Sequence, residues 1–265
     1  MDAAAGNFLD FTYRALVGTA GQASRVSALG YNQDVDTATV PEDVWAGASL
    51  GILNAIDHKL IPLPTAAVSM EVRSDSASDT SAGAGARTLL VGYLAAGYIA
   101  KTATITLNGT TAVAMPEDVL RINSVLVATA GTNPRGVNIG NISIRATGGA
   151  GATYSYMLAG SGIAQSSLYT VPTGRALDLL GLVLSVHQTD TSQRAATFSL
   201  TIANSAGRAI KGLFLGLTSN VGCYNHHVNG DPITTVPATS DVWVTAENVS
   251  ANNTACSAGL IGVLR

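Results

Sequence analysis

The residue types best suited to binding a metal gather in one segment near the C-terminal end. They are Cys223, His226, His227 and Asp231. Thiolate and imidazole are ligands that zinc prefers, but a structural zinc site needs four of them, and neighbouring histidines in a strand point to opposite faces. No second Cys-x-x-Cys or His-x-x-x-His pattern accompanies the segment. We therefore interpret Val221 to Gly230 as a polar loop at a rim or subunit contact, and we predict no metal site.

Two acidic segments have the composition of calcium-binding loops. The first three ligand positions of an EF-hand are imitated by Asn32, Asp34 and Asp36. The sixth position, where that loop requires glycine for its sharp turn, is Thr37, so the EF-hand interpretation fails. Asp75 and Asp79 stand in a second loop that is compatible with weak calcium binding. A solvated turn built on Asp side chains is the favoured interpretation there.

Residues for catalysis are present without a recognisable arrangement. His58 stands in an Asp-His-Lys turn and His187 at the end of a predicted strand. The four glutamates are Glu42, Glu71, Glu117 and Glu247. None has a second acid at a spacing that specifies a pair, although carboxylates converging from distant strands leave a glycosidase open. The glycines at 83, 85, 148, 149 and 151 lack the Gly-Lys-Ser/Thr of a phosphate loop. We therefore predict no catalytic, cofactor-binding or metal residue, and no enzyme.

Charge is scarce in this chain, and the scarcity excludes several partners. Apolar residues make up 47% and charged residues only 12%, with a net charge of −3. The three lysines, Lys59, Lys101 and Lys211, are scattered, so binding of nucleic acid or of a membrane surface through basic residues is not expected. A surface of Ser, Thr, Asn, Gln and Ala instead suits close packing against other subunits.

The first residues and the cysteines indicate where the protein is made. Asp2 and Asp10 stand where a signal peptide needs basic and then apolar residues, and the densest apolar stretch, 176–186, is too short to span a bilayer. Synthesis in a cytoplasm follows. In that reducing compartment two free, mostly buried thiols at Cys223 and Cys256 are favoured over a disulfide.

The pattern along the chain predicts an arm followed by two β lobes. Residues 1–65 lack a clear period, contain short candidate helices at 8–17 and 50–59, and end at the Pro62-Leu-Pro64 stop. From Ala66 onward the pattern is β, and Gly160 marks the expected boundary between lobes 66–160 and 161–265. The predicted strands are 68–73, 101–106, 110–115, 119–128, 138–145, 167–171, 176–186, 197–203, 210–217, 241–246 and 255–264.

Individual patterns refine this prediction. Phe198, Leu200 and Ile202 alternate with polar residues, which is typical of a half-buried strand, whereas the apolar run 176–186 indicates burial on both faces. Asn108-Gly109 between alternating segments predicts a type I′ hairpin. Many short strands with Gly, Pro and Asn turns are typical of antiparallel sandwiches. The fold class is therefore all-β, with antiparallel β-sandwich or jelly-roll lobes preceded by an extended N-terminal arm.

Several segments, in the same order along residues 31–265, resemble a family of virion structural proteins of tailed bacteriophages, common in marine and cyanobacterial phages. They are Asp34-Val-Asp36, Pro41-Glu-Asp-Val-Trp45, Ser76-Ala-Ser-Asp-Thr80, Ala82-Gly-Ala-Gly-Ala-Arg-Thr88, Leu107-Asn-Gly-Thr-Thr111, Tyr169-Thr-Val-Pro-Thr-Gly174, Ser240-Asp-Val-Trp-Val244 and Ser250-Ala-Asn-Asn-Thr254. Thr173 and Arg175 depart from the family's strand–turn, and 92–101 is where the family has a more polar turn.

The resemblance implies a place in the virion and carries over no catalytic residue. We expect a capsid cement or decoration protein that stabilises the shell through contacts with the major capsid protein or other virion proteins. The alternative is a head or tail fibre or appendage that binds a host receptor. Aromatic residues, which anchor such contacts, are only 5% of the chain, and this favours cement. A homo-oligomer is expected, with a trimer favoured by analogy with jelly-roll capsid proteins.

Overall fold

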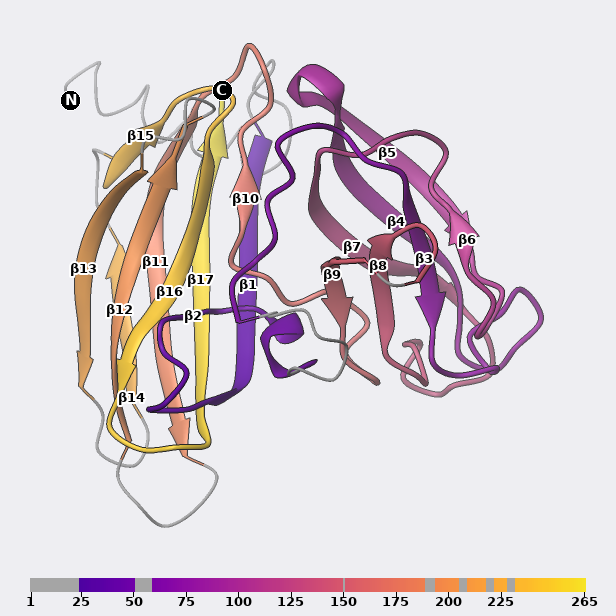
Figure 1. Cartoon of the computed structure of the whole chain (residues 1–265), viewed down its shortest axis with the longest axis horizontal. Helices are drawn as coiled ribbons and strands as arrows, with labels where there is room; N and C mark the ends of the chain where they lie inside the picture. The colour runs from indigo at the N-terminus through magenta and orange to yellow at the C-terminus, as the bar shows by residue number, and fades with distance from the viewer. Residues whose placement is uncertain are drawn as a thin grey trace, which may run out of the picture.

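The structure is a computed structural model that describes residues 24–50, 59–149, 151–188, 194–204, 209–217, 222–227 and 232–265. These residues form strands and turns, with two short 3-10 helices, η1 (Ala46–Leu50) and η2 (Ala96–Tyr98), and no α-helix among them. The strands build two lobes that lie side by side (Figure 1). The fold is therefore all-β with antiparallel sheets, as predicted. The candidate helix at 8–17 and nearly all of the one at 50–59 lie outside the described residues.

The first lobe is a sandwich of two antiparallel sheets, drawn in magenta tones in Figure 1. One sheet has the order β6-β3-β8-β9, formed by Val113–Ala114, Met70–Ser74, Ile142–Ala146 and Thr153–Met157. The other has the order β5-β4-β7, formed by Ile99–Thr106, Ala86–Ala95 and Arg121–Ala130. Leu89 and Val91 of β4 pack with Met70, Ile142 and Ile144 in a core between the sheets.

The second lobe is a larger sandwich. Its first sheet has the order β1-β17-β11-β14, formed by Ser24–Val35, Thr254–Leu264, Leu177–Gln188 and Gly222–His227, with β15 (Thr234–Val236) also on β11. The second sheet has the order β10-β16-β12-β13, formed by Tyr169–Thr170, Asp241–Val249, Ala195–Ala203 and Ala209–Leu217, with β2 (Glu42–Asp43) also on β16. Phe198, Leu182 and Val244 lie in the core between these sheets.

The expectation of an N-terminal arm is wrong for residues 24–43. β1 pairs with β17 from Ser24 opposite Leu264 to Val35 opposite Thr254, and β2 pairs with β16. Val26 and Ala28 on β1 are buried in the second core. In Figure 1 the indigo β1 stands among the orange and yellow strands, on the side facing the first lobe. The physical reason is burial: β1 alternates between the core and the outside like any other strand of that sheet.

The predicted hairpin at Asn108-Gly109 is also wrong. Thr111 N–H donates to the Asn108 carbonyl at 3.1 Å, so the central residues of the turn are Gly109 and Thr110. Gly109 has φ +60°, and neither Asn108 nor Thr110 has positive φ, which is the pattern of a type II′ turn. The strands on either side do not pair with each other either, because β5 pairs with β4 and β6 pairs with β3. The turn passes the chain from one sheet to the other.

Two predictions of strand burial in the second lobe had different outcomes. Phe198 and Leu200 of β12 are buried, with Ile202 packed beside them, as the alternation predicted. β11 is buried on one face only, because Leu182 and Leu184 are enclosed while Val183 between them is partly exposed. The prediction of burial on both faces is therefore wrong. Only the inward face of this strand lies against the second sheet.

A third core and a buried ion pair join the two lobes. Trp45, Ile61 and Leu168 pack together at the junction, with Tyr156 from the first lobe and Trp243 from the second. Nearby, Arg121 on β7 holds Asp241 on β16 through two bonds, Nε to Oδ1 at 2.8 Å and Nη2 to Oδ2 at 2.9 Å. Both side chains are only 7% exposed. The two sandwiches are therefore fastened directly to each other, in addition to the chain segments that connect them.

The junction is extended by a second set of polar contacts. The Asn123 amide of β7 donates to the Thr170 carbonyl at 2.8 Å and accepts the Thr170 N–H at 2.9 Å. Thr170 also donates its hydroxyl to Asp241 Oδ1 at 2.6 Å. The two Asn123–Thr170 bonds cross from one lobe to the other, and the bond to Asp241 holds the Thr170 side chain in place. The contacts fix the orientation of the lobes.

Candidate functional site

The residues weighed as zinc ligands do not lie in a loop. Gly222–His227 is strand β14, paired with β11 so that Cys223 is opposite Ser185 and His226 opposite Leu182. The interpretation of a polar loop is therefore wrong for these six residues, because their backbone hydrogen bonds belong to a sheet. Asp231 lies outside the described residues. Among the residues that the structure describes, no group of three or more His, Cys, Asp or Glu side chains is arranged to hold a metal ion.

The Asp75–Asp79 loop is closed by its own hydrogen bonds. Asp79 is fully buried and accepts four: from the Ser74 hydroxyl at 2.7 Å and from the N–H groups of Ala86, Ile139 and Gly140 at 2.8, 2.9 and 2.8 Å. Asp75 accepts from the N–H and the side-chain amide of Asn141, each at 2.8 Å. These oxygens are already occupied by protein donors, so the structure favours the turn interpretation over calcium binding.

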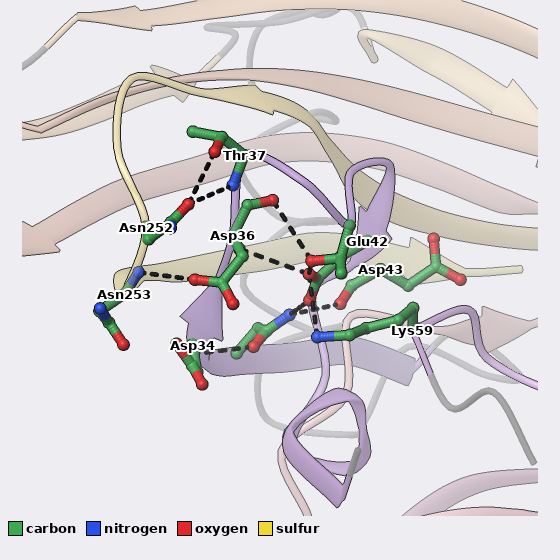
Figure 2. A network of polar contacts seen from close by, with 10 residues as sticks. Asp34, Asp36, Thr37, Glu42, Asp43, Lys59, Asn252 and Asn253 are labelled. Carbon is green, nitrogen blue, oxygen red and sulfur yellow. Dashed lines mark hydrogen bonds and ion pairs between the residues drawn. The ribbon is translucent and has the colours of Figure 1, made fainter. Parts of the chain in front are cut away.

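Asn32, Asp34 and Asp36 belong to a polar network centred on Glu42. Figure 2 shows Asp34, Asp36 and Lys59 around Glu42. Glu42 and Asn32 are fully buried, and the Asn32 amide donates to Glu42 Oε2 at 3.0 Å. Lys59 forms an ion pair with Glu42 Oε1 at 3.0 Å. Burial first, and then the charges of Asp36 and Glu42, raise the pKa of the Asp34 carboxyl above its ordinary value. In the sequence, Asn32, Asp34 and Asp36 only imitated the start of a calcium loop, an interpretation rejected because of Thr37. Their neighbours Glu42 and Lys59 were not predicted.

The glutamates come from separate parts of the fold. Glu71 on β3 pairs with Arg145 at 2.7 Å, and Glu117 pairs with Lys101 at 2.6 Å. Glu247 on β16 accepts a short hydrogen bond from Ser199. The carboxyls of Glu42, Glu71 and Glu117 are thus each engaged with a basic side chain. The structure brings together no pair of glutamates that would support the open glycosidase interpretation.

The structure places only His187 among the two histidines considered for catalysis. His187 Nε2 lies 3.1 Å from the Ser185 hydroxyl on the exposed face of β11. His58 lies outside the described residues. A hydroxyl beside an imidazole is only part of a nucleophilic site, which also needs a group that orients the base and donors for an oxyanion.

The cysteines lie on strands that are not neighbours. Cys256 on β17 pairs with Val186 of β11, and Cys223 on β14 pairs with Ser185 of β11. With β11 between them, their backbones are two strand spacings apart, roughly 10 Å, beyond the reach of a disulfide. Cys256 is a buried free thiol. This register agrees with the prediction that the two cysteines are not joined.

Three adjacent cross-strand rows on the outer face of the β5-β4-β7 sheet contain no charged side chain. The rows are Thr106-Thr88-Thr129, Thr104-Leu90-Leu126 and Thr102-Gly92-Ser124. We call these nine residues the neutral face. Leu90 and Leu126 at its centre are each 37% exposed, and the hydroxyls of Thr88 and Thr129 lie 2.7 Å apart. The alternation of Thr102, Thr104 and Thr106 predicted the part of this face that β5 contributes. β4, the central strand of the face, was not predicted as a strand.

The neutral face continues into a groove between the lobes. The groove, about 190 Å³ in volume, is lined by Ser124 and Leu126 of the neutral face and by Leu29 of β1. A second hollow of about 360 Å³ adjoins it and shares Leu29 and Ile163. Leu29 and Ile163 are 51% and 43% exposed. Face and groove together form a continuous surface of hydroxyl and aliphatic groups that spans both lobes.

Comparisons with known proteins leave the chain without an assigned family. No protein-family model matches it, and no curated protein matches it. Among solved structures it is similar to the VP2 subviral particle of infectious bursal disease virus, with 13% identity and a TM-score of 0.23 over 92% of this chain and 72% of that chain. A structure of the Gt strain of the same virus has 12% identity and a TM-score of 0.19 over 91% and 72%. Scores this low do not indicate a shared fold, and nothing about function is drawn from them.

Within the described part of the chain, no helix is long and apolar enough to cross a bilayer.

Proposed function

We propose that this protein is a structural component of a tailed-phage particle and acts as a capsid cement or decoration protein. The observation that carries the proposal is the neutral face with its adjoining groove, held on a body whose two lobes are fastened together. Removing an uncharged, partly apolar surface from water has a small desolvation cost. Contact with another subunit therefore lowers the free energy and leaves no unpaired charge buried. The sequence resemblance to phage virion proteins points the same way.

The rigid junction suits this role. A cement protein must hold two neighbouring subunits at a fixed separation, and a hinge between its lobes would let them move apart. The buried Arg121–Asp241 pair and the Trp45 core resist such movement. Repetition over a shell multiplies a modest contact, because many copies must be lost before the lattice loosens. The partners are the major capsid protein or other virion proteins together with further copies of this chain, in a homo-oligomer for which we favour a trimer.

No specific observation favours the fibre alternative. Receptor-binding surfaces present aromatic side chains on exposed loops. Here Trp45 is fully buried in the junction, and Trp243 packs beside it with its indole N–H bonded to Asp43 Oδ1 at 3.1 Å. Both tryptophans stabilise the fold and do not form a receptor-binding surface.

A pair of variants tests the proposal on particles. Leu126→Glu places a carboxylate on the neutral face beside the groove, and Ser81→Glu places the same charge on an exposed loop elsewhere in the first lobe. We expect Leu126→Glu to keep the β-type circular dichroism spectrum but to be missing from purified particles, which then release their genome at lower temperature while adsorbing normally to host cells. Ser81→Glu should incorporate normally. Normal genome release with failed adsorption would instead establish the fibre alternative.

A further inference from the structure

The side chains of Lys59, Asn32 and Glu42 are arranged for a covalent reaction. Lys59 Nζ lies 3.0 Å from Glu42 Oε1, and the amide nitrogen of Asn32, Nδ2, donates to Glu42 Oε2 at 3.0 Å. A primary amine and a carboxamide therefore contact one carboxylate, each at a different oxygen. Figure 2 shows Lys59 beside Glu42. An amine is a nucleophile, a carboxamide carbon is an electrophile, and a carboxylate that contacts both can move protons between them.

The Asn32 amide is held in one orientation. Its oxygen, Oδ1, accepts the Asp34 N–H at 3.1 Å, and its nitrogen also donates to the Asp43 carbonyl at 3.4 Å. A backbone N–H aimed at the carbonyl oxygen polarises the carbonyl and stabilises the negative charge that develops when the carbon is attacked. The site thus contains a nucleophile, a proton carrier, a fixed electrophile and an oxyanion donor.

The surroundings bury the Asn32 and Glu42 side chains completely and leave only 18% of the Lys59 side chain exposed to water. Glu42 is further fixed by hydrogen bonds from the Thr39 hydroxyl and the Asp36 N–H. Buried groups held in contact react as if at very high concentration, which is how a slow amide exchange becomes feasible in a folded protein.

We propose that Lys59 and Asn32 form an intramolecular isopeptide bond, with Glu42 as the catalytic proton carrier. Glu42 takes a proton from the Lys59 ammonium, and the freed amine attacks Asn32 Cγ. Glu42 then returns a proton to Nδ2, the Cγ–Nδ2 bond breaks, and the new Nζ–Cγ amide remains. One ammonia leaves and carries the proton away as an ammonium ion, so atoms and charge balance and no oxidant is needed. The chain becomes one unit more negative, because it loses the Lys59 charge.

The bond would close a ring from residue 32 to residue 59. It would tie edge strand β1 to the segment that follows η1, and so to the junction between the lobes. A link of this kind stabilises a fold by restricting the unfolded chain, as a disulfide does, but it forms in a reducing compartment and cannot be reduced. The proposal concerns the chain itself and does not depend on a role in a virion.

Mass spectrometry of the denatured full-length protein tests the bond directly. We expect a mass lower than that of the sequence by one ammonia. Trypsin cleaves after free lysine but not after an acylated one, so residues 26–73, which hold no internal Lys or Arg other than Lys59, should appear as one internally linked peptide. Lys101, whose ion pair with Glu117 includes no carboxamide, serves as the internal control and should be cleaved normally. The unmodified mass with cleavage after Lys59 would overturn the proposal. Loss of ammonia with normal cleavage there would indicate a succinimide and would overturn it too.

Two variants separate the chemistry from the fold. Lys59→Arg keeps a cation beside Glu42 but supplies no nucleophilic amine, and Glu42→Gln keeps the shape of the site but cannot carry protons. Both should show the unmodified mass while retaining the β-type spectrum, with a melting temperature lower by about 10 °C because the ring is open. Complete linkage in Glu42→Gln would remove Glu42 from its catalytic role. If either variant fails to fold, the mass and digestion pattern of the unaltered chain still decide the proposal.

Discussion

The position of Cys256 in the fold makes its thiol unreactive. Its side chain is fully buried on β17, and burial first, with the nearby charge of Glu42 second, raises the pKa of the thiol to about 12. The thiolate is the reactive form of cysteine, so at neutral pH this group is almost entirely unreactive. Cys256 therefore acts as a small core residue.

We predict that Cys256 does not react with a maleimide while the protein is folded. A Cys223→Ser variant leaves Cys256 as the only cysteine, so labelling can be measured without ambiguity. At pH 8 the native variant should stay unlabelled for hours, and labelling should become complete in denaturing urea. Rapid labelling of the native variant at pH 8 would contradict the burial of this thiol.

Gly109 carries a second prediction at the scale of one residue. Its φ of +60° lies in the region that β-branched residues avoid, and a Cβ added there would meet the Ala77 Cα at 3.2 Å. We expect Gly109→Val to lower the free energy of unfolding by about 1–3 kcal/mol, measured by urea denaturation. Thr110→Val, at the next and exposed position of the same turn, is the matched control and should change it by about 0.5 kcal/mol or less. Equal effects in the two variants would show that positive φ at Gly109 is not required.

Among the elements, strands with large alternating side chains were predictable and strands of small residues were not. β12 was evident because Phe198, Leu200 and Ile202 face one way. β1 was missed because its buried positions include Gly30 and Asn32, which give no apolar period. β14 was read as a loop because its sequence is polar. Its partner β11 supplies the apolar residues, and that pairing is set by tertiary structure, not by local propensity.

The candidate site was predictable to a similar extent. The threonine row of β5 and the low charge could be read from the chain, and they indicated packing against other subunits. The groove could not, because Leu29, Leu126 and Ile163 come from segments distant in sequence that meet only in the folded molecule. The ion pair between Glu42 and Lys59 could not be predicted either, because the two residues are 17 positions apart and meet only in the fold.

The integration of β1 and β2 into the second lobe predicts the effect of removing them. A chain that begins at Ala66 loses the edge of one sheet, the buried Val26 and Val35, and the Asp43 carboxylate that accepts the Trp243 indole N–H at 3.1 Å. We expect this chain to have less strand signal per residue in circular dichroism than the full chain, and to bind a dye specific for exposed apolar surface. A truncated chain that melts as cooperatively as the full protein would show that the second lobe does not need β1.

At the scale of the whole molecule, the buried Arg121–Asp241 ion pair is one of the contacts that join the two lobes. Asp241→Asn leaves the Arg121 guanidinium buried opposite a neutral group, and removing one partner of such a pair costs about 3–5 kcal/mol of stability. Asp178→Asn is the matched control, because it breaks a pair whose partner Arg265 is 53% exposed, and should cost about 1 kcal/mol or less. Urea denaturation of both variants checks the difference. Similar losses would mean that the junction contributes no more than an ordinary surface pair.

The pairing of β1 with β17 also constrains how the protein is made. Ser24 is paired with Leu264, which lies 240 residues later in the chain (264 − 24). At ordinary rates of synthesis, the interval between them is roughly 10 to 50 s. The strands of the first lobe are all made within that interval, so they can fold while β1 waits with no partner for its backbone. The second sandwich is completed only after β17 has been made, so among the described strands β1 waits longest for its partner.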